Sequence, residues 1–403
     1  MASPALYQAY HIARQEILPC LLHRQYNGLV DIHEAIAAIR SKKLHYAEPL
    51  HQEKIIALLD GRRRSDEIRR LNPQTRTAQP FPHSRPLPDQ PTDVDEVLKL
   101  MKLHRMAVWF LDDYSRNARC PYWTNEDKWT ADILPLEFTA LEKKRYFRAF
   151  YRLQTYCNMF GNRPHPIDSP DFGPASSWDL GNEREQIWKL FFAAFAPWEV
   201  EEFACLWQHF HDRHAKVYYE VADDLAQYGR TELKDLPEHL HFLPSAAFEV
   251  DANTLSIGAI FVREGLTSLG PTWLFNLLHA KDYITRRNMI LANTDRSYDV
   301  WPLDRPPSTS AALELIYPAD RFDFGTDVCG LQAFLSTVPD IQRPNLSWTK
   351  TWLERLEDNE PLYEEMFETS SRARRWEWAY AFWSDERLSE WETKFGAPLR
   401  DTT

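Results

Sequence analysis

Four residues between positions 205 and 214 belong to the types that bind transition metals: Cys205, His209, His211 and His214. Cys205 and His209 lie four residues apart, so a helix would place them on one face, and zinc accepts both ligand types. His211 would point elsewhere on that helix, and His214 falls on its apolar side. Helical zinc sites pair two histidines around a glutamate, whereas the residues between Cys205 and His209 are typical of a core. We therefore expect a packed thiol with surface histidines, and no metal site.

Two groups of acidic residues point to a different chemistry. Asp112 and Asp113 follow an aromatic run, and Asp224, Tyr228 and Glu232 are spaced four residues apart. In an aromatic-rich helical protein this arrangement resembles class I terpene synthases, whose acidic clusters hold magnesium against a diphosphate. The resemblance implies a Mg-dependent helical-bundle enzyme. However, the first group lacks a distal acid, and a tyrosine stands in the second where a small hydroxyl is expected. Solvated acidic helix ends explain these residues equally well.

Motifs of nucleophilic and nucleotide chemistry are missing from the chain. It contains no GxSxG, GxGxxG or GxxxxGK[ST] segment, so hydrolase, dinucleotide and P-loop functions have no sequence support. We therefore assign no catalytic residue and predict no cofactor. The magnesium enzyme is kept as the alternative function.

A basic run lies close to the first proline-rich segment. It consists of Arg62, Arg63 and Arg64, followed by Arg69 and Arg70. Such a run is typical of a nuclear import signal. A solvated helix end beside a linker has the same composition, so the sequence leaves both interpretations open.

Helical periodicity and helix caps position these residues. Asp31 with Glu34, Asp93 with Glu96, and Thr139 with Glu142 each match a capping box, in which a residue and a glutamate three positions later cap a helix start. The spacing predicts helices over 47–60 (ending at a glycine), 93–118, 139–160, 197–229, 255–292, 347–357, 360–383 and 385–395.

The helix predicted over 197–229 has the clearest pattern. Its apolar residues recur at alternating steps of three and four, with charged residues on the other face. The members of this stripe are Val200, Phe203, Trp207, Phe210, His214, Val217, Val221, Leu225 and Tyr228.

The segment 374–383 (RRWEWAYAFW) places aromatic rings on more than one face of a helix. One face should belong to the core, and we expect the segment to be buried under the N-terminal helices. The other interpretation is an exposed aromatic patch that binds a partner.

Composition limits the partners and the compartment. Residues 1–92 carry 13 Lys and Arg against 9 Asp and Glu, and the rest carries 34 against 50. An acidic body disfavours nucleic acid and anionic membranes, because binding of phosphates requires basic side chains. The five widely spaced cysteines suit reduced thiols, and no apolar run approaches the length of a membrane span. We predict an intracellular protein, cytoplasmic or nuclear.

Four stretches of the chain resemble a known family: KKRYFRAFYRLQTYCNMFG (143–161), APWEVEEFACLWQHF (196–210), EGLTSLGPTWLFNLLHA (264–280) and WAYAFWSDERLSEW (378–391). They are similar to uncharacterised filamentous-fungal (ascomycete) proteins. The resemblance implies an all-helical fold, and many members carry an F-box-like N-terminal segment. Such a segment needs some forty residues of helical Leu/Pro-patterned sequence upstream, and we expect residue 1 to lie after that point.

These observations predict an all-α protein, a large irregular helical body with a small N-terminal helical segment. We expect an N-terminal segment over 1–72, a Pro-rich linker or loop over 73–92 and a main helical domain over 93–403. The predicted function is that of a non-catalytic protein-interaction or adaptor protein related to F-box proteins, with a protein partner, no nucleic acid and no membrane.

Overall fold

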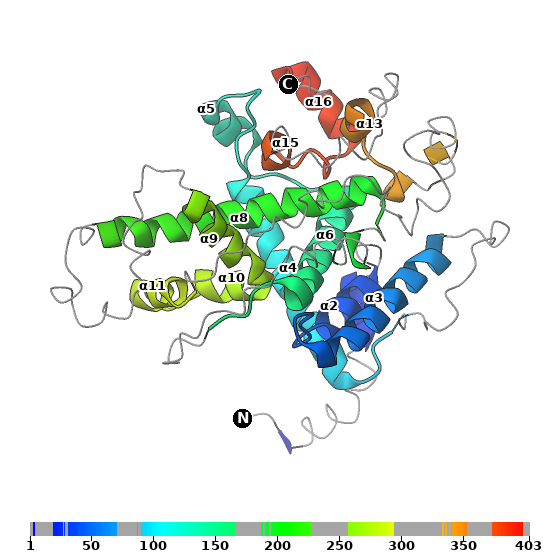
Figure 1. The fold of residues 1–403 in the computed structure, drawn as a ribbon. Coiled ribbons are helices and arrows are strands. Elements are labelled where there is room, and N and C mark those ends of the chain that lie inside the picture. Colours follow the sequence, from blue (N-terminus) through cyan, green and yellow to red (C-terminus); the bar gives the residue numbers. More distant parts are fainter. Residues whose placement is uncertain are drawn as a thin grey trace, which may run out of the picture.

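The structure, a computed structural model, describes residues 19–26, 31–70, 90–165, 195–226, 257–293, 340–352 and 373–397, with short pieces at 3–4, 28, 87, 187, 190–192, 333, 335–336 and 338. This part of the chain contains helices and no strand, so the predicted all-α fold is confirmed there. Figure 1 shows α8 (Pro197–Ala226) crossing α6 (Ala140–Phe160), with the other helices around this pair. None of the described helices is long and apolar enough to cross a membrane.

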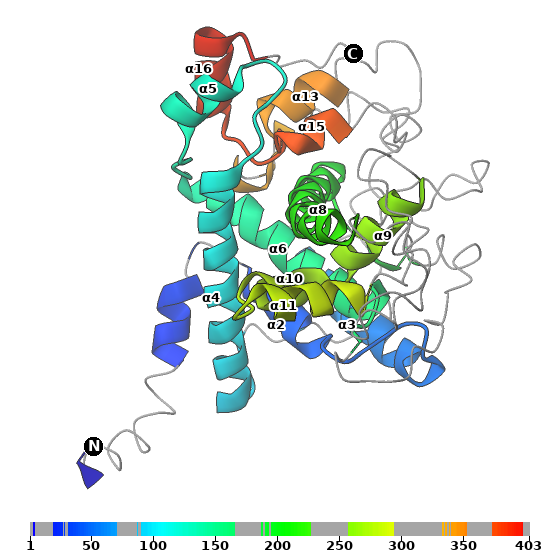
Figure 2. The same ribbon diagram turned by 90° about the vertical axis from the view of Figure 1, so that its left-hand side faces the viewer.

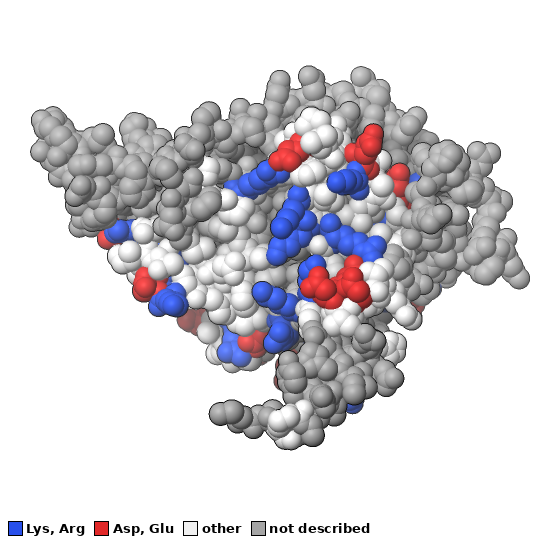
Figure 3. All heavy atoms as spheres, turned by 90° about the horizontal axis from the view of Figure 1, so that it is seen from below, with Lys and Arg blue, Asp and Glu red and all other residues white. Residues whose placement is uncertain are grey.

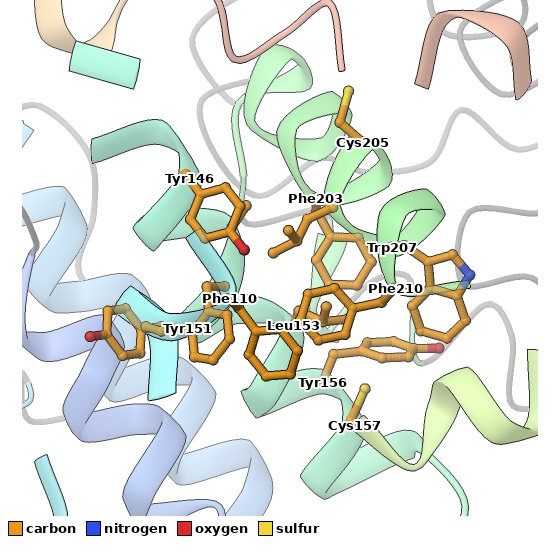
Figure 4. Close-up of a cluster of buried hydrophobic side chains, with 14 of the residues drawn as sticks. Phe110, Tyr146, Tyr151, Leu153, Tyr156, Cys157, Phe203, Cys205, Trp207 and Phe210 are labelled. Atoms are coloured by element: carbon orange, nitrogen blue, oxygen red, sulfur yellow. The ribbon is translucent and has the colours of Figure 1, made fainter. Parts of the chain in front are cut away.

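Helix α6 lies at the centre because almost all of its residues are buried. Thr139 and Glu142 form the predicted capping box at its start, and Gly161 ends it. Aromatic side chains of α6 and α8 interlock in the core, and Figure 4 shows Tyr156 beside Trp207. Such rings bury large apolar areas, which is the main stabilisation of the fold.

Helix α8 is buried more completely than its sequence predicts. The described members of the apolar stripe are buried as expected, but so are Glu201 and Glu202 on the other faces and Glu199 on the side of the stripe. Charged residues thus lie opposite the stripe as predicted, but in the first half of α8 they are buried. Carboxylates tolerate such burial only when cations or donors satisfy them, and neighbouring helices supply both.

The N-terminal helices belong to the same core. Helix α2 (Ile32–Arg40) packs on α6 and on α4 (Val94–Asn117), and α3 (Pro49–Arg70) packs on α2. Helix α3 continues past Gly61, where a helix end was predicted. Tertiary contact outweighs the low helix propensity of glycine here, because Arg62 on the next turn is buried against Glu34.

Two of the three predicted capping boxes differ from the expected form. Asp31 makes no side-chain cap, and Glu34 binds arginines instead, so that prediction is wrong. Asp93 caps α4 as predicted, accepting from the Glu96 N–H, but the Glu96 carboxylate binds Thr92 and Arg40.

Helices α9 (Ile257–Ser268), α10 (Gly270–Leu278) and α11 (Tyr283–Leu291) fill the predicted 255–292 region. The turn between α9 and α10 meets the end of α6 so closely that a Cβ on Gly161 would lie 2.0 Å from the Ser268 carbonyl oxygen. Gly270 has a φ of +85° and lies against Cys157. These two glycines fix how α6 packs on α9 and α10.

The C-terminal helices are α13 (Leu346–Trp352), α15 (Ala373–Glu377) and α16 (Asp385–Phe395). The helix predicted to reach residue 383 ends earlier, because Ala379 has a φ of +53° and turns follow. The aromatic segment is buried as expected, but against α8 and α6 rather than under the N-terminal helices. Trp376 and Tyr380 both donate to Glu201, and Arg145 donates to the Trp383 carbonyl at 2.6 Å.

Candidate interaction surface

A ladder of buried ion pairs joins α2, α3, α6 and α8. Arg148 on α6 binds both carboxylate oxygens of Glu202 on α8, at 2.8 and 2.5 Å. One turn later, Arg152 lies 2.9 Å from Glu199 on α8 and 2.9 Å from Glu34 on α2. These side chains are almost fully buried and packed among core residues. The ladder therefore holds helices together and offers no access to a ligand.

Two arginines of the predicted import signal lie inside the folded protein. Arg62 donates to Glu34 at 3.0 Å and stacks on the Phe195 ring, and Arg63 is also buried. An import receptor binds exposed cations, so these two guanidiniums are inaccessible in this conformation. The side chains of Arg64, Arg69 and Arg70 lie outside the described part, and the import signal stays a prediction.

Burial and charge act against each other at Glu34. Burial raises the pKa of this carboxyl, but the charges of Arg152 and Arg62 lower it more, to about 2. The carboxylate is therefore ionised at neutral pH and pairs with two guanidiniums at once.

The cysteine and histidines of α8 do not form a site together. The Cys205 thiol is buried, which raises its pKa well above the ordinary value. His214 is buried in a stack on Trp273, and burial lowers its pKa to about 3. His209 is buried too, against Asp113 and Tyr114 of α4, so the expectation of a surface histidine is wrong there, whereas His211 is half-buried. Among the residues that the structure describes, no three His, Cys, Asp or Glu side chains are placed to hold a metal ion.

The acidic residues considered for magnesium lie apart. Asp112 is exposed and pairs with Arg116, whereas Asp113 is buried and pairs with Arg213 on α8 at 2.8 Å. Asp224 pairs with Arg287 and lies eleven residues beyond Arg213, about 16 Å along the helix axis. Tyr228 and Glu232 fall outside the described residues. The described carboxylates thus do not converge on one position.

Helix α4 carries the surface with the clearest binding character. Leu98, Lys102, Arg105 and Val108 succeed one another at steps of three and four, so they form a stripe on one side of the helix. All four are exposed, and the two apolar members are exposed by 39% and 44%. We call this stripe the α4 face. In Figure 2, α4 stands along one edge of the molecule, with the helical segment 19–26 beside its lower half.

An aromatic cluster borders the α4 face where α10 meets α4. Trp109 lies 5.3 Å from Phe275 and 4.6 Å from His279, measured between ring centroids. Phe275 and His279 stack at 4.0 Å. Trp109 and Phe275 are half-buried and His279 is exposed, so the cluster is partly open to solvent while its packing fixes the rings.

The end of the molecule that holds α2 and α3 is locally basic, although the chain as a whole is acidic. Helices α2, α3 and the first half of α4 lie at the lower end of the molecule in Figure 1. Seen from below, Lys and Arg side chains gather across the middle of this end, with fewer acidic groups beside them (Figure 3). A partner approaching this end therefore meets mainly positive side chains.

No family model, no curated protein and no solved structure matches this chain.

Sequence reasoning missed the α4 face. The residues 94–108 follow a helical pattern whose apolar members all read as core, and this pattern alone does not separate Val97, which is buried, from Leu98 and Val108. The aromatic cluster depends on Phe275 and His279, which lie far from Trp109 in sequence. The one local signal is the placement of Lys102 and Arg105 between the two exposed apolar residues.

Proposed function

We propose that this protein is a non-catalytic interaction protein that binds a protein partner through the α4 face and the aromatic cluster beside it. The observation that carries the proposal is the exposure of Leu98 and Val108 together with Lys102 and Arg105 on one side of a well-packed helix. Isolated exposed apolar residues are common on proteins, but here they continue into an ordered aromatic cluster.

The chemistry of the surface suits a protein interface. Tryptophan and arginine are the residue types that most often dominate binding energy, and Trp109 and Arg105 lie one turn apart. Contact with Phe275 and His279 holds the Trp109 ring in place before binding, which reduces the entropy lost on association.

The finer proposal is a substrate-recruiting or scaffold role related to F-box proteins, in the cytoplasm or nucleus. It is supported by the resemblance of four stretches of the chain to proteins that often carry an F-box-like segment. The four described cysteines are free, which suits a reducing compartment.

The test is affinity purification of the tagged full-length chain from the cells that make it, followed by mass spectrometry. Val108→Glu places a charge on the α4 face, and Leu50→Glu does so on α3, where Leu50 is 87% exposed. We expect a partner that the wild type and Leu50→Glu retain and that Val108→Glu loses. An adaptor with a cullin among the retained proteins would support the F-box-related role. Identical protein sets for all three baits would contradict the proposed surface.

A further inference from the structure

The charges along α4 are not balanced evenly. At one end of the helix Asp95 pairs with Lys99 at 2.5 Å, and at the other Asp112 pairs with Arg116 at 2.9 Å. Between these pairs, Lys102 and Arg105 form no ion pair with any residue that the structure describes. The centre of the α4 face therefore has two cations with no acidic partner in the described part of the chain, although the whole chain has a net charge of −12.

The apolar residues of the α4 face restrict the class of ligand. Leu98 and Val108 flank the two cations and are separated by about 15 Å along the axis. A nucleic acid backbone would pair with Lys102 and Arg105 but would leave both apolar side chains without a partner. A protein segment with apolar and acidic side chains satisfies all four residues.

The shape of the surface favours a helical segment. Strand addition requires an exposed sheet edge, and the described ranges contain no strand. A helix packed along α4 would present side chains at steps of three and four, the same steps as the α4 face. The distance from Leu98 to Val108 corresponds to about three turns of such a helix.

Resting on the interaction function proposed above, we propose that the α4 face binds an acidic amphipathic helix of a partner protein. Its apolar residues contact Leu98, Val108 and the edge of Trp109, and its carboxylates pair with Lys102 and Arg105. Pairing with the two cations orients the acidic segment on the α4 face, so Lys102 and Arg105 contribute to specificity as well as affinity.

The test is a selection from a displayed library of helical peptides, with the purified full-length chain as bait. The first variant bait is Lys102→Glu/Arg105→Glu. Its matched control is Lys128→Glu/Lys216→Glu, which makes the same charge change at two exposed lysines on α5 (Glu126–Lys128) and α8. Circular dichroism of the three baits checks that they fold alike, as expected for exposed positions.

We expect the wild type to enrich peptides with Asp and Glu beside apolar residues at helical spacing. The affinity of these peptides should fall about tenfold or more for the Lys102→Glu/Arg105→Glu variant and stay unchanged for the control variant. Their affinity for the wild type should weaken as salt rises from about 50 to about 500 mM. Enriched peptides that depend on the α4 face but are neutral or basic would overturn the acidic partner and leave the interaction function standing.

Two other outcomes would also overturn the inference. If no enriched peptide is affected by Lys102→Glu/Arg105→Glu or by Val108→Glu, both the acidic partner and the proposed surface fail. If a labelled single-stranded RNA oligonucleotide binds the wild type and is lost by the α4 variant alone, the cations serve nucleic acid instead of a protein.

Discussion

Glu34 has a different role in the structure from the one that its sequence position predicts. Its position after Asp31 matches a helix cap, yet its carboxylate accepts hydrogen bonds from Arg62 at 3.0 Å and Arg152 at 2.9 Å. It thereby links α2, α3 and α6 inside the core. Removing one member of a buried ion pair leaves the other charges uncompensated, which costs far more than losing a surface pair.

We therefore predict that Glu34→Gln lowers the free energy of unfolding by about 3–5 kcal/mol. Chemical denaturation at neutral pH measures this loss, with Glu53→Gln on the exposed side of α3 as the control. The pKa of Glu34 is about 2 in the folded protein against an ordinary value of 4.5, so its contribution is complete above pH 4.5 and is lost as pH falls toward 2. As pH falls from 4.5 toward 2, Glu34→Gln should therefore lose less stability than the wild type. If Glu34→Gln and Glu53→Gln lower the free energy of unfolding equally, the proposed role of Glu34 is refuted.

His214 gives a prediction of its own about pH. Burial lowers its pKa from 6.5 to about 3, so the folded protein keeps the ring neutral where the unfolded chain binds a proton. Burial of the neutral ring therefore costs no folding free energy above pH 6.5. The cost grows as pH falls toward 3, because the unfolded chain gains a proton there that the folded protein does not. Nitrogen chemical shifts of the ring should still report a neutral imidazole at about pH 5. A ring that is protonated at that pH would show that the stack on Trp273 is open to solvent.

At the scale of the elements, the packing of α6 on α9 and α10 depends on small residues. A Cβ on Gly161 would lie 2.0 Å from one backbone oxygen and 2.7 Å from another, and backbone atoms cannot move aside as side chains can. We expect Gly161→Ala to destabilise the protein by about 3 kcal/mol or more.

Gly396→Ala is the matched control for this prediction. Its φ is +69° and no atom lies within 4 Å of the added Cβ, so only backbone strain of about 1–2 kcal/mol applies. Thermal unfolding of both variants separates crowding from strain. If Gly161→Ala is no worse than Gly396→Ala, the close approach of the α9–α10 turn to α6 is incorrect.

Most elements follow from local patterns in the sequence, and their exceptions have one physical cause. Thr139, Asp93 and Gly161 act at helix ends as predicted, because caps depend on nearby backbone groups. Glu34 was predicted to cap a helix and Glu202 to lie on a charged face, because a sequence pattern cannot show that arginines from another helix contact them. For the same reason the α4 face could not be found from the sequence: its exposure depends on which distant helices leave it uncovered.

At the scale of the whole molecule, the N-terminal helices and the main helical body share one core. Helices α2 and α3 share one apolar core with α6 and α8, and the Tyr46 N–H bonds to the Met159 carbonyl at 2.8 Å. The N-terminal helices are thus packed on the body rather than tethered to it. The segment 19–26 lies against α4, where Tyr26 donates to the Leu100 carbonyl, and it borders the edge on which the α4 face lies.

The most direct test of the proposed interaction is site-specific photo-crosslinking in the cells that make this protein. A photoreactive phenylalanine analogue replaces Val108 in one variant and Leu50 in the other, both exposed apolar positions on helices. We predict a discrete crosslinked protein from position 108 that is absent from position 50, and that disappears when Lys102→Glu/Arg105→Glu is added. No crosslink at position 108, or the same products from both positions, would contradict a partner on the α4 face.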